Sequence, residues 1–271
     1  MLKKVFFLPV ELYQNRRLIL TLAKNDFKTK YAGSYLGIVW AFIQPIVTVL
    51  VYWFVFGLAL RAGGNRTVPF ILWLVAGLVP WFFVQDGLIN GTNALIEYNY
   101  LVKKVVFKIS ILPMVKIISA LFVHLFFIVV VLVLYACHGY FPDLYVLQLI
   151  YYSFSVFVLI LGISYLTSAV VVFFRDLSQI INIALQVGVW MTPIMWSFQD
   201  LGLAADGTIA TILKLNPIYY IVSGYRDALI DKVWFWEHPT LTLYYWIFTV
   251  VIFFLGARLF KKLKIHFADV L

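Results

Sequence analysis

The chain has 271 residues, of which 64% are hydrophobic and only 12% are charged. Soluble domains are about 45–50% apolar and about 25% charged, so this composition excludes a water-soluble globular protein and indicates that lipid solvates much of the surface. The formal net charge of +9 would suit a nucleic-acid partner, and the single cysteine, Cys137, excludes an internal disulfide.

The N-terminal arm, residues 1–35, is predicted to be cytoplasmic and interfacial. Its apolar run at residues 5–10 is too short for a cleavable signal. From about residue 12 to residue 31, a helical period of about 100° per residue separates a basic face from an apolar face. The basic face carries Arg17, Lys24 and Lys28. We expect this helix to lie flat on the inner leaflet, either as a simple anchor or as a lever that passes motion from a cytoplasmic partner to the first span.

Residues 36–260 are predicted to form an all-α bundle of six transmembrane helices, followed by a cytoplasmic tail at residues 261–271. A helix needs about 20 mostly apolar residues to cross a bilayer. Six segments meet that requirement: Leu36–Leu60, Val68–Asn90, Ile117–Cys137, Val146–Phe174, Leu177–Phe198 and Leu241–Phe260. Pro193 removes a backbone donor from the fifth segment and should kink or end it there. The whole chain is therefore expected to be one membrane domain.

The longest external loop, about Gln199–Thr240, contains the apolar stretch Ile218–Ile230, which is too short to span. We predict a short re-entrant or interfacial helix there, because amphipathic aromatic segments settle at the level of the lipid headgroups. An external gate is predicted from its aromatic and basic residues, which are Tyr219, Tyr220, Tyr225 and Arg226.

The lysines and arginines are unevenly distributed over the loops. Sixteen of the 21 fall in the N-terminal arm, the second loop, the fourth loop and the tail. The positive-inside rule therefore predicts that both termini are cytoplasmic, in a cell membrane. The excess charge then belongs to the membrane surface, and we expect no nucleic-acid partner.

Two predicted spans carry polar and aromatic side chains at every fourth position, which places them on one side of each helix. These residues are Trp40, Gln44, Thr48, Tyr52 and Phe56 in the first span, and Ser178, Asn182, Gln186 and Trp190 in the fifth. Amides in hydrocarbon are costly without partners or water. The two rows therefore indicate either contacts between helices or a path for a substrate rich in sugar and phosphate.

Two ionisable residues inside predicted spans have simpler interpretations. Asp86 lies close to the cytoplasmic end of its span, so solvation or pairing with a lysine is expected in preference to a functional acid. His124 lies in the middle of its span without an acidic neighbour, so we predict a hydrogen-bonded bundle residue rather than a proton relay.

The sequence has no phosphate-binding loop of the G-x-x-x-x-G-K-[ST] type, no serine elbow and no metal-ligand set. We therefore predict no catalytic residue, metal or cofactor in this chain, and a transporter of this kind would take its energy from another subunit. The second loop, residues 92–108, begins with the cap residues Thr92 and Asn93. It is expected to dock as a short helix on a cytoplasmic partner, or else to be an ordinary basic loop.

Several short motifs together resemble the polysaccharide-exporter branch of the ABC-2 permease family over nearly the whole chain. In chain order these are Tyr31–Trp40, Gln44–Pro45, Gly77–Phe83, Asn93–Ile96, Lys103–Val105, Ile111–Pro113, Phe174–Asp176, Asn216–Pro217 and Tyr225–Leu229. Within that branch, Val51–Leu58 and Phe70–Leu74 are most similar to wall teichoic acid permeases.

The resemblance implies a homodimer joined to two ABC ATPase subunits, which would bind ATP and Mg²⁺. The implied substrate is an undecaprenyl-linked wall teichoic acid, or alternatively an O-antigen or capsular polysaccharide. The implied ATPase contacts comprise Thr92, Asn93, Leu95, Ile96, Glu97, Tyr98, Lys103, Lys104, Arg175 and Asp176. The competing interpretations are a membrane enzyme that modifies glycolipids, and a passive channel or proton-driven flippase.

Overall fold

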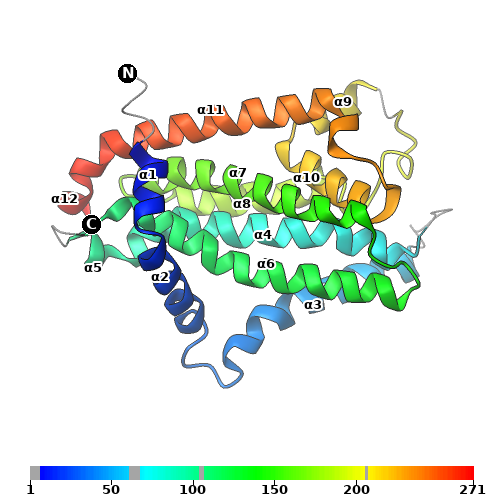
Figure 1. Ribbon diagram of the computed structural model, residues 1–271, viewed down its shortest axis with the longest axis horizontal. Helices are drawn as coiled ribbons and strands as arrows, with labels where there is room; N and C mark the ends of the chain where they lie inside the picture. Colours follow the sequence, from blue (N-terminus) through cyan, green and yellow to red (C-terminus); the bar gives the residue numbers. More distant parts are fainter. Residues whose placement is uncertain (1–6, 61–67, 104–106, 205–206) are drawn as a thin grey trace.

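The computed structural model describes residues 7–60, 68–103, 107–204 and 207–271. Helices and turns make up these ranges, which contain no strand, so the all-α prediction is confirmed for them. Five of the described helices are long and apolar enough to cross a membrane: Gly37–Ala59, Phe70–Glu97, Ile109–Cys137, Leu144–Val171 and Pro239–His266. They run along the long axis of the molecule (Figure 1).

Helix α4 (Phe70–Glu97) is the centre of the bundle. It packs against α6 (Leu112–Cys137), α7 (Gln148–Val171) and α10 (Pro217–Arg226). Over residues 70–84 its side chains are apolar on all sides, and most of them are buried. A helix that is hydrophobic all round belongs in the interior of a bundle rather than at its edge.

Helix α11 (Pro239–Leu263) packs along α7, and two glycines allow the close approach. A Cβ atom on Gly256 would lie 2.5 Å from the carbonyl oxygen of Gly162. A Cβ atom on Gly162 would lie 3.0 Å from the Cα atom of Phe253. Small residues let helix backbones meet in a membrane, where van der Waals packing drives association.

Helix α3 (Trp40–Tyr52), which continues as a π-helix over Trp53–Ala59, stands apart from the other helices. Only 6% of the most apolar stretch of Gly37–Ala59 is buried, against 72% for Phe70–Glu97. Figure 1 shows α3 at the edge of the bundle, beside α6. Most of its surface is therefore left for lipid or for another chain.

Helix α8 (Leu177–Met191) is shorter than predicted and does not reach Phe198. The chain becomes extended at Thr192, because the ring of Pro193 disfavours helical backbone in the residue before it. The expected effect of Pro193 is confirmed, and the predicted boundary at Phe198 is wrong. With five helices of spanning length in the described ranges, the count of six spans is not confirmed.

The N-terminal arm forms two helices, α1 (Phe7–Gln14) and α2 (Arg16–Thr29), instead of one. The predicted basic face is exposed, and it carries Arg17, Lys24 and Lys28. The opposite face of α2 packs against α6 through Ile19 and Ala23. Asp26 lies buried on that same face.

The second loop differs from its prediction. Helix α4 runs on to Glu97, so Thr92 and Asn93 lie inside it and cap no new helix. Thr92 is fully buried, and its hydroxyl oxygen lies 2.7 Å from that of Thr167 on α7. That contact extends the packed part of α4 beyond the predicted boundary. After Glu97 the chain forms only the short helix α5 (Asn99–Val102).

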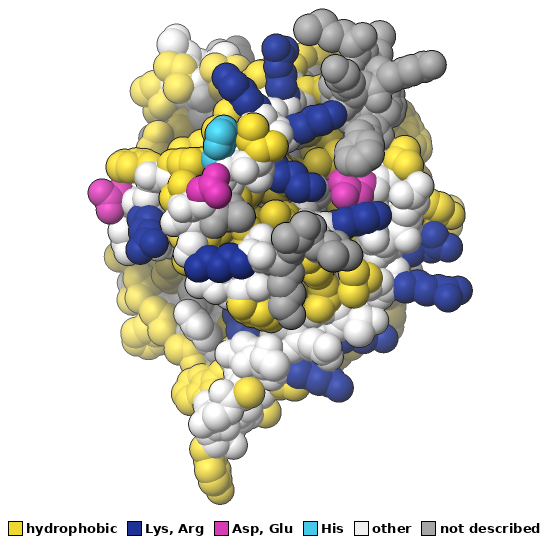
Figure 2. All heavy atoms as spheres, turned by 90° about the vertical axis from the view of Figure 1, so that its left-hand side faces the viewer, with side chains coloured by type: hydrophobic (Ala, Val, Ile, Leu, Met, Phe, Trp, Pro, Cys, Tyr) yellow, Lys and Arg dark blue, Asp and Glu magenta, His cyan; other side chains and the backbone are white. Residues whose placement is uncertain are grey.

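The C-terminus lies at one end of the bundle, together with α1, α5 and α12 (Phe267–Val270), as Figure 1 shows. Lysines and arginines gather on the surface of this end (Figure 2). They include the exposed residues Lys103 and Lys262. The opposite end carries α9 (Thr208–Lys214) and α10.

Candidate functional site

A cavity of about 370 Å³ separates α3 from α4 and α6. We call it the α3 cavity. It is lined on the α3 side by Trp40, Gln44, Thr48 and Tyr52, which are four of the five members of the predicted polar row. Across the cavity lie Gln85 and Asp86 of α4. The polar row therefore faces a hollow between helices along most of its length.

A second cavity of about 320 Å³, the α8 cavity, lies between α3, α4 and α8. Thr48 and Tyr52 line it from α3, and Gln186 and Trp190 line it from α8. The ring of Phe56 lies 6.3 Å from that of Trp190, which brings the outer ends of the two rows together. Because Thr48 and Tyr52 line both cavities, the two hollows share one wall.

The two remaining members of the α8 row are placed differently. The Ser178 hydroxyl donates a hydrogen bond of 2.6 Å to Oδ1 of Asn93 on α4. Asn182 is half-buried and lines neither cavity. The row thus provides a helix–helix contact at one end and a cavity wall at the other, so both interpretations of the sequence pattern apply to parts of it.

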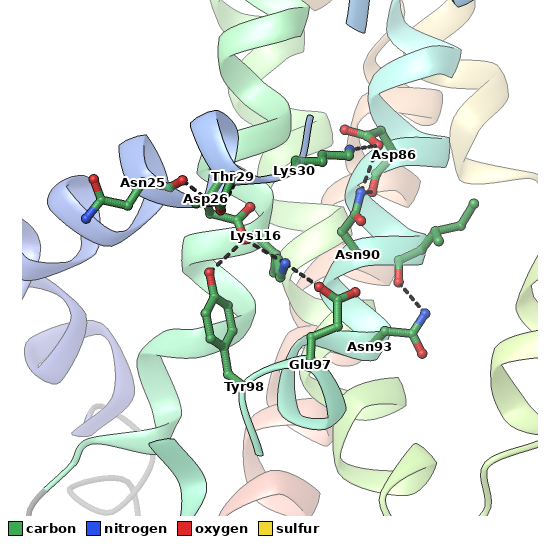
Figure 3. Close-up of polar contacts among 11 residues, drawn as sticks. Asn25, Asp26, Thr29, Lys30, Asp86, Asn90, Asn93, Glu97, Tyr98 and Lys116 are labelled. Carbon is green, nitrogen blue, oxygen red and sulfur yellow. Dashed lines mark hydrogen bonds and ion pairs between the residues drawn. The ribbon is translucent and has the colours of Figure 1, made fainter. Parts of the chain in front are cut away.

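An ion pair lies at the rim of the α3 cavity. Lys30, at the end of α2, donates a hydrogen bond of 2.6 Å to Oδ1 of Asp86, and Asn90 donates one of 2.8 Å to the same atom (Figure 3). The predicted pairing of Asp86 with a lysine is confirmed. Burial lowers the pKa of Lys30, but the charge of Asp86 and the hydrogen bond to it outweigh burial and leave that pKa above its ordinary value.

His124 lies on the wall of the α3 cavity and is held by hydrogen bonds from two elements. Its Nε2 atom lies 2.9 Å from the Tyr225 hydroxyl on α10 and 3.2 Å from the Ser153 hydroxyl on α7. Its ring stacks on Phe83 at 4.6 Å. The prediction of a hydrogen-bonded bundle residue is confirmed.

The predicted external gate is mainly a packing unit. Tyr220, Tyr225 and Arg226 are buried, and Tyr219 is half-buried. Tyr220 contacts the hydroxyl of Tyr151 at 3.0 Å, so α10 is anchored to the bundle. Three of the four residues are thus packed inside the bundle in this structure, and the gate stays a prediction.

The residues predicted to contact the ATPase differ in how far their side chains are exposed to solvent. Thr92 and Leu95 are buried, so their side chains cannot contact another protein, while Asn93 and Ile96 are half-buried. Tyr98 is half-buried and donates a hydrogen bond to Asp26. The exposed members are Glu97, Lys103, Arg175 and Asp176, and Lys104 lies outside the described residues. Of these, Lys103, Arg175 and Asp176 remain candidates for a contact with another subunit, because the Glu97 carboxylate is already paired with Lys116.

Gln85 lines both cavities and was not predicted to do so, although an amide inside a predicted span was the same signal that identified Gln44 and Gln186.

The groups that line the two cavities determine what chemistry the site can perform. In the parts of the chain that the structure describes, no group of three or more His, Cys, Asp or Glu side chains is placed to hold a metal ion. The lining instead offers amides, hydroxyls and aromatic rings, which suit hydrogen bonding and stacking.

The helices and the polar cavities define a multi-pass membrane protein with a lined hollow beside its first long helix. Residues 17–230 match the family described as ABC-2 type transporter. This match covers most of the chain, which therefore belongs to the ABC-2 type transporter family.

Several relatives are similar to the chain over nearly its full length. It is 27% identical to the O-antigen export system permease protein RfbA of Myxococcus xanthus, over 96% of this chain and 97% of that protein. It is 25% identical to a protein of the same name from Klebsiella pneumoniae, over 94% and 95%. It is also 24% identical to the polysialic acid transport protein KpsM of Escherichia coli, over 88% and 90%.

Proposed function

We propose that this chain is the membrane subunit of an ATP-driven exporter that moves a lipid-linked polysaccharide of O-antigen or capsular type out of the cytoplasm. The observation that carries the proposal is the wall of Thr48, Tyr52, Gln186 and Trp190 shared by α3 and α8. Amides and hydroxyls hydrogen-bond sugar hydroxyls, and aromatic faces stack on sugar rings. An uncharged wall binds such a chain weakly enough to let it slide.

The relatives guide the choice of polymer. Their names refer to O-antigen and polysialic acid. They give no support to wall teichoic acid, which the sequence motifs favoured, so the O-antigen or capsular alternative becomes the main proposal. An undecaprenyl carrier, which the family resemblance of the sequence motifs implied, remains part of the proposal.

The energy source and the assembly belong to the same proposal. The sequence contains no phosphate-binding loop, so two partner subunits supply ATP hydrolysis. The large uncovered surface of α3 supports a homodimer in which two copies enclose the path. The basic end of the bundle faces the cytoplasm by the positive-inside rule, which places both termini there.

The lining is tested with Gln44→Leu and Gln186→Leu, singly and together, in cells that carry the partner ATPase. Each change removes hydrogen-bonding capacity worth about 1 kcal/mol, and a factor of ten corresponds to about 1.4 kcal/mol. We therefore expect surface polymer to fall by roughly fivefold in each single variant and by roughly thirtyfold in the double variant. Assembly with the ATPase and membrane insertion should be unchanged.

The matched control is Val187→Leu, which changes an exposed side chain on α8 next to Gln186. Export that continues at the normal rate in the variant that carries both glutamine substitutions would overturn the assignment of these residues to the lining.

Depletion of the chain tests the proposed function itself, because finished lipid-linked polymer should then accumulate on the inner leaflet. Loss of polymer synthesis would favour a membrane enzyme, and export without an active ATPase would favour a channel or a proton-driven flippase.

A further inference from the structure

A buried charge cluster connects three elements at the end of the bundle that carries the C-terminus. Lys116, in the second turn of α6, lies 2.6 Å from Oδ1 of Asp26 on α2 and 2.5 Å from Oε2 of Glu97 at the end of α4 (Figure 3). The Tyr98 hydroxyl donates a hydrogen bond of 2.7 Å to the same oxygen of Asp26. We call these four residues the Lys116 cluster.

The two carboxylates differ in their exposure to solvent. The side chain of Asp26 is 7% exposed and that of Lys116 is 8% exposed, whereas that of Glu97 is 46% exposed. Burial and the hydrogen bond to Asp26 raise the pKa of Tyr98, so this hydroxyl stays protonated and keeps its hydrogen to donate. Asp26 is thus held from two sides, while Glu97 faces water on one side.

This difference determines which contact can open. Separating Lys116 from Asp26 would leave a buried carboxylate without its counter-ion, which is a severe cost. Separating Lys116 from Glu97 leaves Glu97 free to hydrate, and Lys116 keeps Asp26 as its partner. The α2–α6 contact is therefore fixed, and the contact between α6 and the end of α4 is releasable.

The position of the releasable contact gives it a role. Glu97 is the last residue of α4, and the chain continues directly into α5 and the exposed Lys103. These residues belong to the segment for which an ATPase contact is proposed, while α2 belongs to the arm proposed as a lever. A push on α5 thus reaches α2 and α6 through Lys116.

We infer that Lys116 is a positioning residue, which couples the ATPase to the membrane helices through a fixed contact with Asp26 and a releasable contact with Glu97. This inference rests on the proposed function. Without the Glu97 contact, the start of α5 keeps the Tyr98–Asp26 hydrogen bond to α2 but loses its ionic link to α6, so less of its movement is transmitted. ATP is then hydrolysed with less export.

The decisive variant is Glu97→Gln, studied in the complete complex with its ATPase subunits. It removes the charge of the exposed partner and leaves the buried Asp26–Lys116 pair in place. We expect normal assembly and a normal or raised ATPase rate, with polymer exported per ATP reduced by about fivefold or more, the lower end of a typical coupling effect. A role in stability alone would lower the assembled amount and leave that ratio unchanged.

The matched control is Asp143→Asn, which neutralises a carboxylate of similar exposure in its ion pair with Lys232, outside the cluster. Lys116→Arg keeps both charge contacts and should retain the export ratio. Lys116→Met should lower the amount of polymer exported per ATP, measured on the fraction of complex that assembles. Asp26→Ala should reduce the assembled amount far more than Glu97→Ala, which tests the fixed and releasable contacts without any activity measurement.

Two results separate this inference from the proposed function. If the unaltered complex shows no ATP-dependent export, the proposed function fails, and the coupling role fails with it. If the unaltered complex exports normally and Glu97→Gln leaves export per ATP unchanged, the coupling role alone is overturned.

Discussion

At the scale of single residues, Arg226 shows how one buried side chain holds an irregular backbone. Its Nη1 atom donates to the Pro193 carbonyl at 2.7 Å, and its Nη2 atom donates to the Ile194 carbonyl at 2.9 Å. The guanidinium lies 3.4 Å from the ring centroid of Trp73. Carbonyl groups released where α8 ends need donors once they are buried. Arg226 therefore fastens α10 to the chain that follows α8.

We predict that Arg226→Leu destabilises the protein by about 2–3 kcal/mol, because two carbonyls lose a charged donor. Arg226→Lys should recover only part of that loss, since an ammonium group lacks the planar fork that reaches both oxygens. Thermal unfolding in detergent measures the effect, with Arg17→Leu on the exposed face of α2 as the control. Equal stability of the two leucine variants would show that Arg226 is not an anchor.

Periodicity made the residues of the polar rows predictable, because side chains four apart share a helix face wherever that helix lies. The Lys116 cluster had no such signal. Asp26, Glu97 and Lys116 belong to three different elements, and only tertiary packing brings them together. Burial of Tyr225 and Arg226 was missed for a related reason, since an aromatic and basic segment looks the same in a sequence whether it faces headgroups or a helix bundle.

At the scale of elements, the contact between α7 and α11 depends on two glycines whose backbones meet. There is no room for a side chain at Gly256, where a Cβ atom would lie against the carbonyl of Gly162. Helices that approach this closely gain dispersion energy along their length. The crossing therefore fixes α11 on the outside of the bundle.

We predict that Gly256→Val forces α7 and α11 apart and destabilises the protein by about 1–3 kcal/mol, the usual cost of overpacking. Val251→Leu, on the exposed side of α11, is the matched control. Protease resistance and thermal unfolding of the purified protein report the difference. A variant as stable as the control would mean that the helices can separate without cost.

The boundaries of the elements were predictable only in part. Hydropathy located each long helix, and Pro193 correctly indicated a disruption within the fifth predicted span. The extension of α4 to Glu97 was missed because Thr92 and Asn93 are typical cap residues. Both sit inside α4, and the packing of Thr92 against Thr167 outweighs that local preference.

At the scale of the whole molecule, one face of the bundle is incomplete. Helix α3 leaves a row of exposed apolar side chains, which includes Val47, Val51 and Phe54. Contiguous apolar surface in a membrane meets lipid or another helix. A second copy of the chain packed against α3, as the proposed function has it, would cover this apolar row.

We predict that single cysteines at Val47, Val51 and Phe54, introduced after Cys137→Ser, include at least one that forms disulfide-linked dimers in native membranes. Disulfides require Cα atoms within about 7 Å, so the reaction reports close contact. Cysteines at Val129 and Val133 are equally exposed on α6 and should remain monomeric. Dimers from the α6 cysteines but none from the α3 cysteines would place the interface elsewhere.

The length of α8 has a consequence for the energy of permeation. Its 15 residues extend only about 22 Å at about 1.5 Å per residue, against about 30 Å of hydrocarbon in a typical bilayer. Beyond Met191 the chain is extended at Thr192, and Arg226 of α10 holds the carbonyl groups of Pro193 and Ile194. A hydrophilic molecule beside α8 would thus run along a helix that matches a thinner hydrocarbon layer than a typical bilayer presents. The cost of moving it would depend on local bilayer thickness as well as on the residues that it touches.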